Sequence, residues 1–170
     1  MSLLALQNLS VTIDGKPILR GIDLSVLGAL RATQEFTPLL EAGGAGGSGT
    51  GERSGGSVVM MASAVIHHSR ERYAGYKIAK TALVALGHSL ATELGPRGIR
   101  VNTVAPGYTA TERLQKLHAD PAEADKLRSR IPARRFGEPG EVAAAIAFLA
   151  TNEAGYINGQ ELLVDGGWSI

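Results

Sequence analysis

The sequence contains no cysteine, which excludes disulfide bonds and thiolate metal sites. No apolar run reaches the ~20 residues that a membrane-spanning helix needs. The N-terminus lacks the basic region and long apolar run of a secretory signal. The formal net charge is +1, so charge gives no reason to expect nucleic acid or an anionic membrane as a partner. These absences predict a cytoplasmic protein that binds neither nucleic acid nor membrane.

A phosphate-binding loop of the ATPase type is also missing. No G-x-x-x-x-G-K-[ST] pattern occurs, so the lysine and hydroxyl that would hold phosphates and magnesium are absent. Gly46 to Gly51 has the spacing, but Glu52 stands where the lysine should be. Many of the 22 glycines fall in residues 42–56, AGGAGGSGTGERSGG, which we expect to be a flexible loop.

What is present is the composition of one globular domain. The chain has 170 residues, of which 44% are hydrophobic and 19% charged, enough to bury a core. Strand patterns alternate with helix patterns, which predicts an α/β fold. The expected strands are 57–62, 99–105 and 160–164, and the expected helices are 27–41, 76–94 and two that begin near Asp120 and Glu138.

The helix expected over 27–41 is amphipathic. Its inward positions at near-helical spacing include Leu30, Thr33 and Phe36. Pro38 is expected to kink this helix or end it early, because proline removes a backbone donor and clashes with the preceding turn.

Three polar residues around the next strand and helix can meet at one place. Ser63 lies at the C-terminal end of the apolar run, where ligands gather in open α/β sheets. Tyr76 and Lys80 are four residues apart, so they share a helix face. A nearby cation favours the phenolate and would lower the pKa of Tyr76. Tyr76 could then exchange a proton with a carbonyl or alcohol oxygen that the Ser63 hydroxyl holds.

Taken alone, the Y-x-x-x-K pattern is weak, and a Tyr–Lys pair on a helix is more often a surface feature than a catalytic one. The set is more specific, because Ser63 follows an apolar run and precedes Tyr76 by thirteen residues. His67 and His68 lie between them and could form a metal pair. No carboxylate or third histidine has metal-ligand spacing beside them, so we favour a loop position and predict no metal site.

Four stretches of the sequence carry a resemblance to a known family. They are SVVMMAS, YAGYKIAKTALVALGHSLATELGPRGIRVNTVAPGYTATE, IPARRFGEPGEVAAAIAFLAT and YINGQELLVDGGWS. In this order and spacing they resemble the C-terminal half of a short-chain dehydrogenase/reductase. The resemblance implies that residues 27–170 are the C-terminal part of a Rossmann-like, doubly wound parallel sheet. It also implies NAD(P)(H) as cofactor and a small carbonyl or alcohol as substrate.

The resemblance assigns roles to the three polar residues. It implies that Tyr76 is the acid/base, that Lys80 lowers its pKa and holds the cofactor ribose, and that Ser63 orients the carbonyl. Tyr76 and Lys80 would thus also contact the cofactor. It further implies that this helix and the one before it pack against a second subunit, so that the protein is a homodimer or homotetramer.

The loop after the 99–105 strand matches a second family pattern. Pro106, Gly107 and Thr111 fit P-G-x-x-x-T. The resemblance implies that this loop covers the nicotinamide, with backbone near Thr109 and the Thr111 hydroxyl reaching the amide or the phosphates. A plain strand-to-loop turn explains the Pro-Gly pair but not its position after the Tyr–Lys helix.

Parts of the family pattern are missing. This sequence has no counterpart of the family's first strands, of its glycine fingerprint, or of the residue that determines the choice between NAD and NADP. Ser25 stands where the family has an asparagine that helps to hold a water in a proton relay. Without the central strands, the strand that begins at Ser57 is expected to have an open edge.

Residues 1–26 look different in origin. Alternating apolar residues up to Ile13, the turn signal Asp14-Gly15 and a second extended run from Ile18 to Val26 predict a β-hairpin. The segment resembles the opening of an ABC-transporter ATP-binding subunit. Our hypothesis is that this hairpin pairs with the open edge of the strand that begins at Ser57.

The sequence therefore predicts an NAD(P)-dependent oxidoreductase of the short-chain type, closest in general likeness to 3-oxoacyl-carrier-protein reductases. The alternative is a non-catalytic, truncated homologue that serves as an oligomerisation or interaction module. An ATPase fragment is a distant third reading.

Overall fold

The computed structural model describes most of the chain outside the N-terminal segment and the glycine-rich loop. The described residues are 12–13, 16–17, 26–43, 55–68, 73–112, 114 and 120–170. The glycine-rich stretch 44–54 and Ser25 lie outside them, so the predictions made for these residues stay predictions. No helix in the described ranges is long and apolar enough to cross a membrane.

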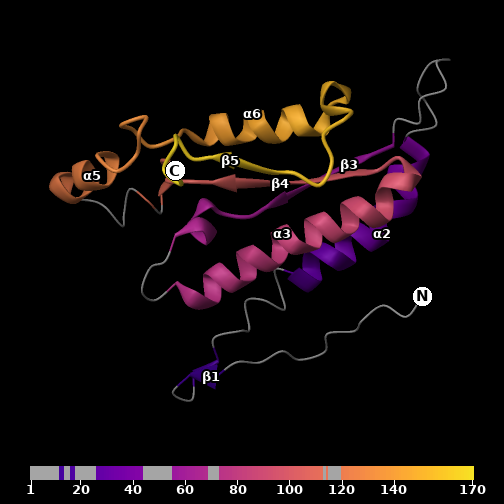
Figure 1. Cartoon of the computed structure of the whole chain (residues 1–170), viewed down its shortest axis with the longest axis horizontal. Coiled ribbons are helices and arrows are strands. Elements are labelled where there is room, and N and C mark those ends of the chain that lie inside the picture. The colour runs from indigo at the N-terminus through magenta and orange to yellow at the C-terminus, as the bar shows by residue number, and fades with distance from the viewer. Residues whose placement is uncertain are drawn as a thin grey trace.

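A parallel three-stranded sheet forms the centre of the molecule (Figure 1). Its order is β3 (Ser57–Met61), β4 (Arg100–Pro106) and β5 (Glu161–Val164). Residue Ser57 is opposite Arg100, and Thr103 is opposite Glu161. The α/β prediction is confirmed, and each strand lies within one residue of its predicted bounds.

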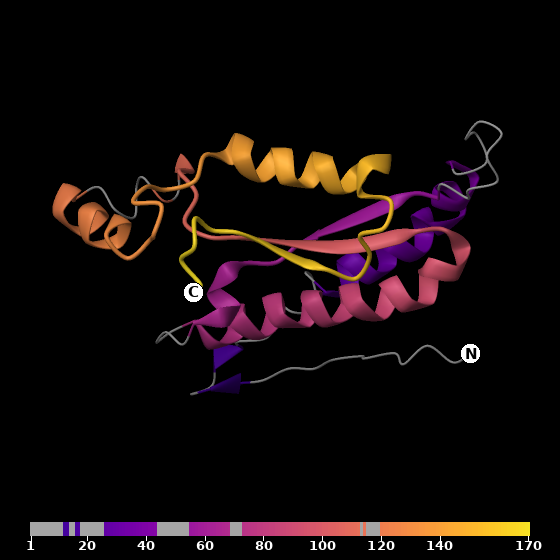
Figure 2. The same cartoon turned by 45° about the horizontal axis from the view of Figure 1, so that its top comes forward.

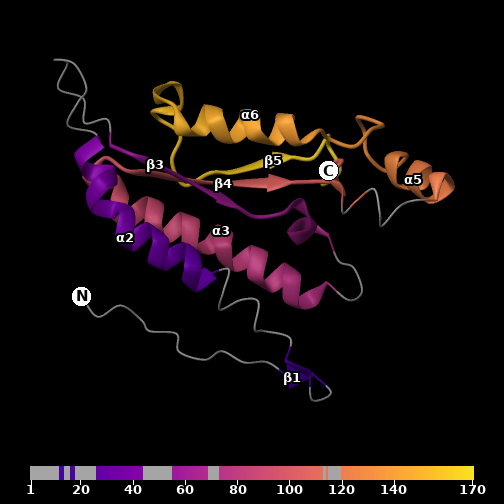
Figure 3. The same ribbon diagram turned by 180° about the vertical axis from the view of Figure 1, so that it is seen from behind.

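Helices cover both faces of this sheet, as in a doubly wound, Rossmann-like fold (Figure 2). Helices α2 (Gly28–Gly43) and α3 (Ala74–Leu94) lie side by side on one face (Figure 3). Helix α6 (Pro139–Ala150) covers the other face. The short α5 (Pro121–Arg128) lies beyond the carboxyl end of the strands.

The face under α2 and α3 holds the largest apolar cluster. Leu83, Leu90 and Leu94 of α3 pack there against Met60 of β3 and Val101 of β4. These side chains recur at helical spacing along α3, as the sequence predicts. The helix ends at Leu94, where Gly95 and Pro96 begin a short 3₁₀ turn.

Helix α2 departs from its prediction in two ways. It continues through Pro38 to Gly43 instead of ending early. Its buried side is formed by Leu30 and Leu40, which pack on the core, and by Thr33 and Thr37, which are buried. Phe36 is 58% exposed, so its prediction as an inward residue is wrong. The Thr33 and Thr37 hydroxyls donate to carbonyls four residues back, which lets these polar side chains lie inside.

The opposite face is covered by α6. Val142 and Leu149 are buried there with Val104 of β4, and Ile146 packs beside them. Both predicted proline helix starts are confirmed: α5 begins at Pro121 after the cap Asp120, and α6 begins at Pro139. The Asp120 carboxylate accepts a hydrogen bond from the Ala122 amide, as a capping residue does.

The N-terminal hairpin is present but lies apart from the main sheet. Strand β1 (Thr12–Ile13) pairs with β2 (Lys16–Pro17) in antiparallel fashion, which confirms a hairpin about the predicted turn. These two described strands form a sheet of their own and do not pair with β3. The rest of the predicted hairpin lies outside the described residues, so its pairing with the edge of β3 stays a prediction. Among the described strands, β3 has β4 as its one neighbour, and the predicted open edge is confirmed.

Candidate active site

The candidate residues gather at the carboxyl edge of the parallel sheet. Ser63 follows β3, Pro106 ends β4 with Gly107 next to it, and Asp165 follows β5. Because parallel strands all end at the same edge, the segments after them meet there. The order of the strands thus brings together segments that are far apart in the sequence.

Ser63 occupies a capping position. Its backbone is extended, with φ −165° and ψ 138°, and it precedes the 3₁₀ helix η3 (Ala64–His67). The Ser63 hydroxyl oxygen accepts a hydrogen bond from the Val65 amide at 3.4 Å. This length is at the weak end for a hydrogen bond, so the hydroxyl keeps capacity to donate to another oxygen.

Tyr76 and Lys80 lie one turn apart on α3, which begins at Ala74, two residues before the predicted start. Lys80 Nζ is 5.8 Å from the centroid of the Tyr76 ring, so the predicted shared face is confirmed. The Tyr76 side chain is 47% exposed. It is therefore open to a substrate from outside the chain.

The hydrogen bond of Lys80 goes to the main chain of β3. Lys80 Nζ donates to the Met61 carbonyl oxygen at 2.8 Å, two residues before Ser63. This bond ties the middle of α3 to the end of β3. Partial burial lowers the pKa of the Lys80 ammonium from its usual value. The three predicted catalytic residues thus share one region, with Met61 as the main-chain link.

The loop after β4 is held on both sides. The Gly107 amide donates to the Val164 carbonyl at 3.0 Å, and Thr109 pairs with Gly137 in a parallel bridge. The Thr109 hydroxyl donates to the Gly107 carbonyl at 3.3 Å. The Thr111 hydroxyl oxygen accepts from the Leu114 amide at 3.4 Å. Both hydroxyls are therefore used within the loop, and neither bond is short.

Gly107 lies against the turn that follows β5. A Cβ at position 107 would be 2.6 Å from the Asp165 Cβ, a distance that atoms do not adopt. Burial of the Asp165 carboxyl opposes its ionisation, but hydrogen bonds from Ser169 and from the Gly167 amide outweigh that effect. The pKa of Asp165 therefore lies below its usual value.

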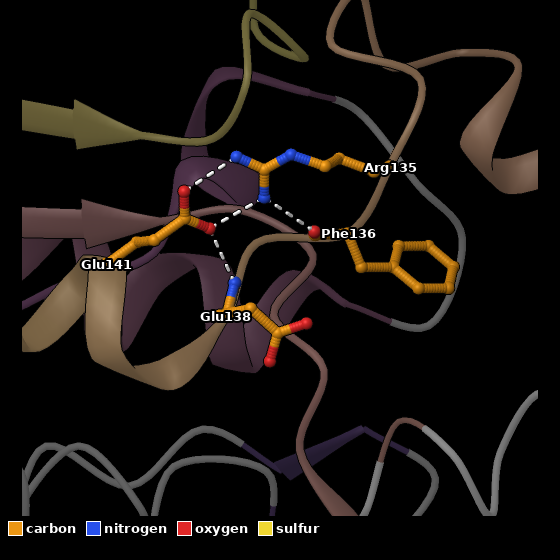
Figure 4. Close-up of polar contacts among 4 residues, drawn as sticks. All are labelled: Arg135, Phe136, Glu138 and Glu141. Atoms are coloured by element: carbon orange, nitrogen blue, oxygen red, sulfur yellow. Dashed lines mark hydrogen bonds and ion pairs between the residues drawn. The ribbon is translucent and has the colours of Figure 1, made fainter.

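An ion pair fixes the segment around Gly137, which pairs with Thr109 of the loop after β4. Arg135 donates to both carboxylate oxygens of Glu141, at 2.7 and 2.6 Å, and the Glu138 amide donates to the same carboxylate at 2.8 Å (Figure 4). The Arg135 hydrogen bonds lower the pKa of Glu141 to about 2. The clamp holds the start of α6 and the turn that contains Gly137.

Sequence reasoning did not single out this clamp. The predicted helix start at Glu138 was the available signal, because an acid three residues later can reach back to the Glu138 amide. The arginine that completes the clamp lies three residues before Glu138, outside any capping pattern.

The chain belongs to the short-chain dehydrogenase/reductase family. The family model described as Enoyl-(Acyl carrier protein) reductase matches residues 4–169. That match includes most of residues 1–26, whose division from the rest of the chain stays a prediction. The family prediction is confirmed, and the resemblance of the N-terminal segment to ABC-transporter subunits stays a hypothesis.

Two curated relatives and one solved structure illustrate the likeness. The chain is 39% identical over 116 residues to dehydrogenase/reductase SDR family member 4 of Sus scrofa, covering 68% of this chain and 42% of that protein. It is 40% identical over 119 residues to D-threitol dehydrogenase of Mycolicibacterium smegmatis, covering 70% and 45%.

The solved structure is a gluconate 5-dehydrogenase from Burkholderia cenocepacia in complex with NADP and tartrate. It superposes with a TM-score of 0.75 at 30% identity, covering 87% of this chain and 54% of that one. The chain thus spans about half the length of the relatives and structures that it matches. The activity of the whole relatives is therefore a matter of proposal for this chain.

The donor set at the sheet edge fits one end of a nicotinamide cofactor. The Lys80 ammonium and the Tyr76 phenol suit a ribose, and the polar loop from Pro106 to Thr111 suits a carboxamide. In the described part of the chain, no strand leads through a glycine loop into a helix to hold a pyrophosphate. Nor do the described residues contain a group of three metal-ligating side chains.

Proposed function

We propose that this chain is an NAD(P)(H)-dependent oxidoreductase that interconverts a small carbonyl compound and its alcohol. The main observation behind the proposal is the Tyr76–Lys80 pair at the carboxyl edge of a parallel sheet. Lys80 bonds to the carbonyl of Met61, two residues before Ser63. The family membership supports the proposal, and so do the relatives named as dehydrogenases. A cytoplasmic location, as expected from the sequence, remains part of the proposal.

Each residue has a distinct task in this reaction. The Ser63 hydroxyl donates to the carbonyl oxygen and fixes its position. The exposed Tyr76 phenol gives a proton to that oxygen during reduction and removes one from the alcohol during oxidation. Lys80 places a positive charge beside Tyr76, which favours the phenolate during proton transfer. A bound nicotinamide would supply or accept the hydride.

The cofactor would be held at its nicotinamide end. Lys80 and Tyr76 would contact the ribose, and the loop with Pro106, Gly107, Thr109 and Thr111 would cover the ring. The Arg135–Glu141 clamp supports this loop through the Thr109–Gly137 bridge.

The substrate is proposed as a small ketone or secondary alcohol. General sequence likeness suggests a 3-oxoacyl compound, and the names of the relatives suggest a polyol or sugar acid. A homodimer or homotetramer is the proposed assembly, because α2 exposes Phe36 and Leu39 to the outside.

The replacement Tyr76→Phe tests this function. It removes the phenolic proton and leaves the ring, so ketone reduction with NADH or NADPH should fall at least about a hundred-fold. Tyr73→Phe is the matched control, because Tyr73 is the edge-to-face neighbour of Tyr76 at 6.3 Å and has no role in proton transfer. Equal activity of the two variants would overturn the proposal.

A further inference from the structure

A cavity of about 920 Å³ lies at the amino edge of the parallel sheet, at the end opposite α5 (Figure 1). It is lined by Gly55 before β3, by Ile99 and Arg100 at the start of β4, and by residues of η5 (Asn152–Ala154). The candidate catalytic residues lie at the other end of these strands. Seven residues of β4 separate the two edges, a distance of roughly 20 Å. The cavity is therefore remote from the candidate active site, and its volume suits a small molecule.

Glycines form much of the wall of this cavity. They are Gly55, Gly95, Gly98 and Gly155. A Cβ at position 55 would lie 2.1 Å from the Gly98 carbonyl oxygen, and a Cβ at position 155 would lie 2.9 Å from the Asn152 carbonyl oxygen. Neither position can therefore hold a larger residue without a shift of the main chain. The cavity stays open because the main chain itself forms this part of its surface.

Arg100 brings a positive charge to the cavity. Its Nη1 donates to the Leu149 carbonyl at 2.8 Å and its Nη2 donates to the Thr151 carbonyl at 2.9 Å, which caps the end of α6. A guanidinium has more N–H donors than these two bonds use. None of the ion pairs between described residues includes Arg100. Partial burial lowers the pKa of Arg100 from its usual value, so a bound anion would stabilise the charged guanidinium.

A negative charge lies in the same wall. Glu153 belongs to η5 and lines the cavity. It is two residues after Thr151, whose carbonyl Arg100 holds, and two residues of chain span at most ~7 Å. Glu153 is exposed and makes no hydrogen bond or ion pair to the part of the chain that the structure describes. The cavity thus presents a cationic donor and an anionic acceptor, and neither has an opposite charge from the described chain beside it.

Tyr156 adds an aromatic surface to this pair of charges. It lines the cavity and is fully exposed, at 104%. Its ring takes part in none of the ring contacts between described residues. Aromatic side chains contribute a large apolar area when they are covered. The Tyr156 ring is therefore available to an apolar or aromatic group of a ligand.

We propose that this cavity binds a small zwitterion with an aromatic body, of which an aromatic α-amino acid is the simplest example. The ligand carboxylate pairs with the remaining N–H groups of Arg100, and the ligand ammonium pairs with Glu153. The aromatic body packs on Tyr156. A simple anion is disfavoured because Glu153 repels it, and a simple amine is disfavoured because Arg100 repels it. The site goes beyond the proposed function, since it uses none of the residues assigned to the reaction.

The test is a titration of the intact chain with L-phenylalanine, followed by saturation-transfer NMR of the ligand. Phenylpropionate lacks the ammonium and phenethylamine lacks the carboxylate, so these two compounds separate the two charged contacts. We expect saturable binding of phenylalanine, at least about ten-fold tighter than that of either analogue. Equal affinities for phenylalanine and one of the analogues would overturn the zwitterion site. Absence of saturable phenylalanine binding would do the same.

Two variants at exposed positions assign the binding to this cavity. In Glu153→Gln the partner of the ammonium is lost, so phenylalanine and phenylpropionate should bind alike. In Tyr156→Ala the affinity for phenylalanine should fall at least about five-fold. Glu123→Gln is the matched control, because it removes an exposed carboxylate from α5 at the opposite edge, and it should leave binding unchanged. A folded Glu153→Gln variant that still prefers phenylalanine, or an unaltered affinity in Tyr156→Ala, would overturn the assignment; circular dichroism checks the fold.

Discussion

Lys80 illustrates how one side chain can serve both structure and chemistry. Its ammonium donates to the Met61 carbonyl and also lies 5.8 Å from the Tyr76 ring. The main-chain bond fixes where the positive charge sits before any substrate arrives. Such preorganisation is what a proton-transfer site needs, because the charge does not have to be moved during the reaction.

Gly107 gives a prediction at the residue scale. Gly107→Ala would force a Cβ to within 2.6 Å of Asp165, so we expect the free energy of unfolding to fall by about 1–3 kcal/mol. Denaturant unfolding measures this change. Gly140→Ala is the control, because a Cβ there meets nothing within 4 Å. Equal stabilities of the two variants would contradict the close approach of the two turns.

The Arg135–Glu141 clamp gives a prediction about pH. Glu141 has a pKa of about 2, below its ordinary 4.5, so the folded state favours the charged form. The stabilisation is present above pH 4.5 and is lost as the pH falls towards 2. Glu141→Gln should therefore be less stable than the wild type at neutral pH, and the difference should shrink across this interval.

Denaturant unfolding at a series of pH values tests this clamp. Glu153→Gln removes another exposed carboxylate and serves as the control. A stability difference for Glu141→Gln that stays constant between pH 4.5 and pH 2 would show that the carboxylate charge does not act through Arg135.

At the residue scale, the sequence allowed predictions only for residues close together in the chain, whose spacing determines their relative positions in a helix. The shared face of Tyr76 and Lys80 follows from helix geometry alone, and the structure confirms it. The stacking of His68 on Trp168 could not be predicted in this way. The two residues are a hundred positions apart, and they meet because the segments after β3 and β5 end at the same edge of the sheet.

At the scale of elements, α2 shows where local rules fail. Pro38 lies inside a helix that runs from Gly28 to Gly43. Leu40, two residues after Pro38, lies against Gly56, and the Gly56 amide donates to the Leu40 carbonyl at 2.9 Å. These contacts hold the C-terminal turns in helical form despite the proline. Tertiary packing, which cannot be read from the local sequence, outweighs the cost of Pro38 within the helix.

The exposed Pro38 gives a prediction for this helix. Pro38→Ala restores a backbone donor and removes the clash with the preceding turn, so we expect the free energy of unfolding to rise by about 1–3 kcal/mol. Urea denaturation followed by circular dichroism measures the change. Gln34→Ala, at an exposed position one turn earlier, should alter stability little. A Pro38→Ala variant no more stable than Gln34→Ala would show that the proline costs this helix nothing.

Element boundaries were predictable wherever the sequence carries explicit stop and start signals. The Gly95–Pro96 stop and the proline starts at Pro121 and Pro139 all lie where predicted. The inward face of α2 was predicted correctly at Leu30 and Thr33 and wrongly at Phe36, which is exposed. Hydrophobicity alone does not distinguish these cases.

At the scale of the whole molecule, the two main surface features are the open edge of β3 and the exposed face of α2. The sequence predicted the open edge from the missing family strands, and the structure confirms it for the described strands. It did not establish what pairs with this edge, because pairing between distant strands has no local signal; the described strands β1 and β2 do not pair with it. This chain aligns with 42% and 45% of the length of two curated relatives.

The exposed apolar side chains of α2 give a prediction about assembly. Leu39 is 68% exposed, and burying it in a homo-oligomer would stabilise the assembly. Leu39→Glu should therefore lower the molecular mass measured by sedimentation to that of a monomer. Gln34→Glu on the same helix adds the same charge at a polar position and should leave the mass unchanged. A monomeric wild type would contradict the proposed homo-oligomer.

The most direct test of the central claim is a titration of the purified chain with NADH and NADPH, followed by nicotinamide fluorescence. The account predicts saturable binding of at least one of them, weakened at least about ten-fold in Lys80→Met. Lys77→Met is the matched control, because Lys77 bonds to the His68 carbonyl and should leave cofactor affinity unchanged. Absence of saturable binding up to millimolar concentration would contradict the account, and it would favour a non-catalytic homologue.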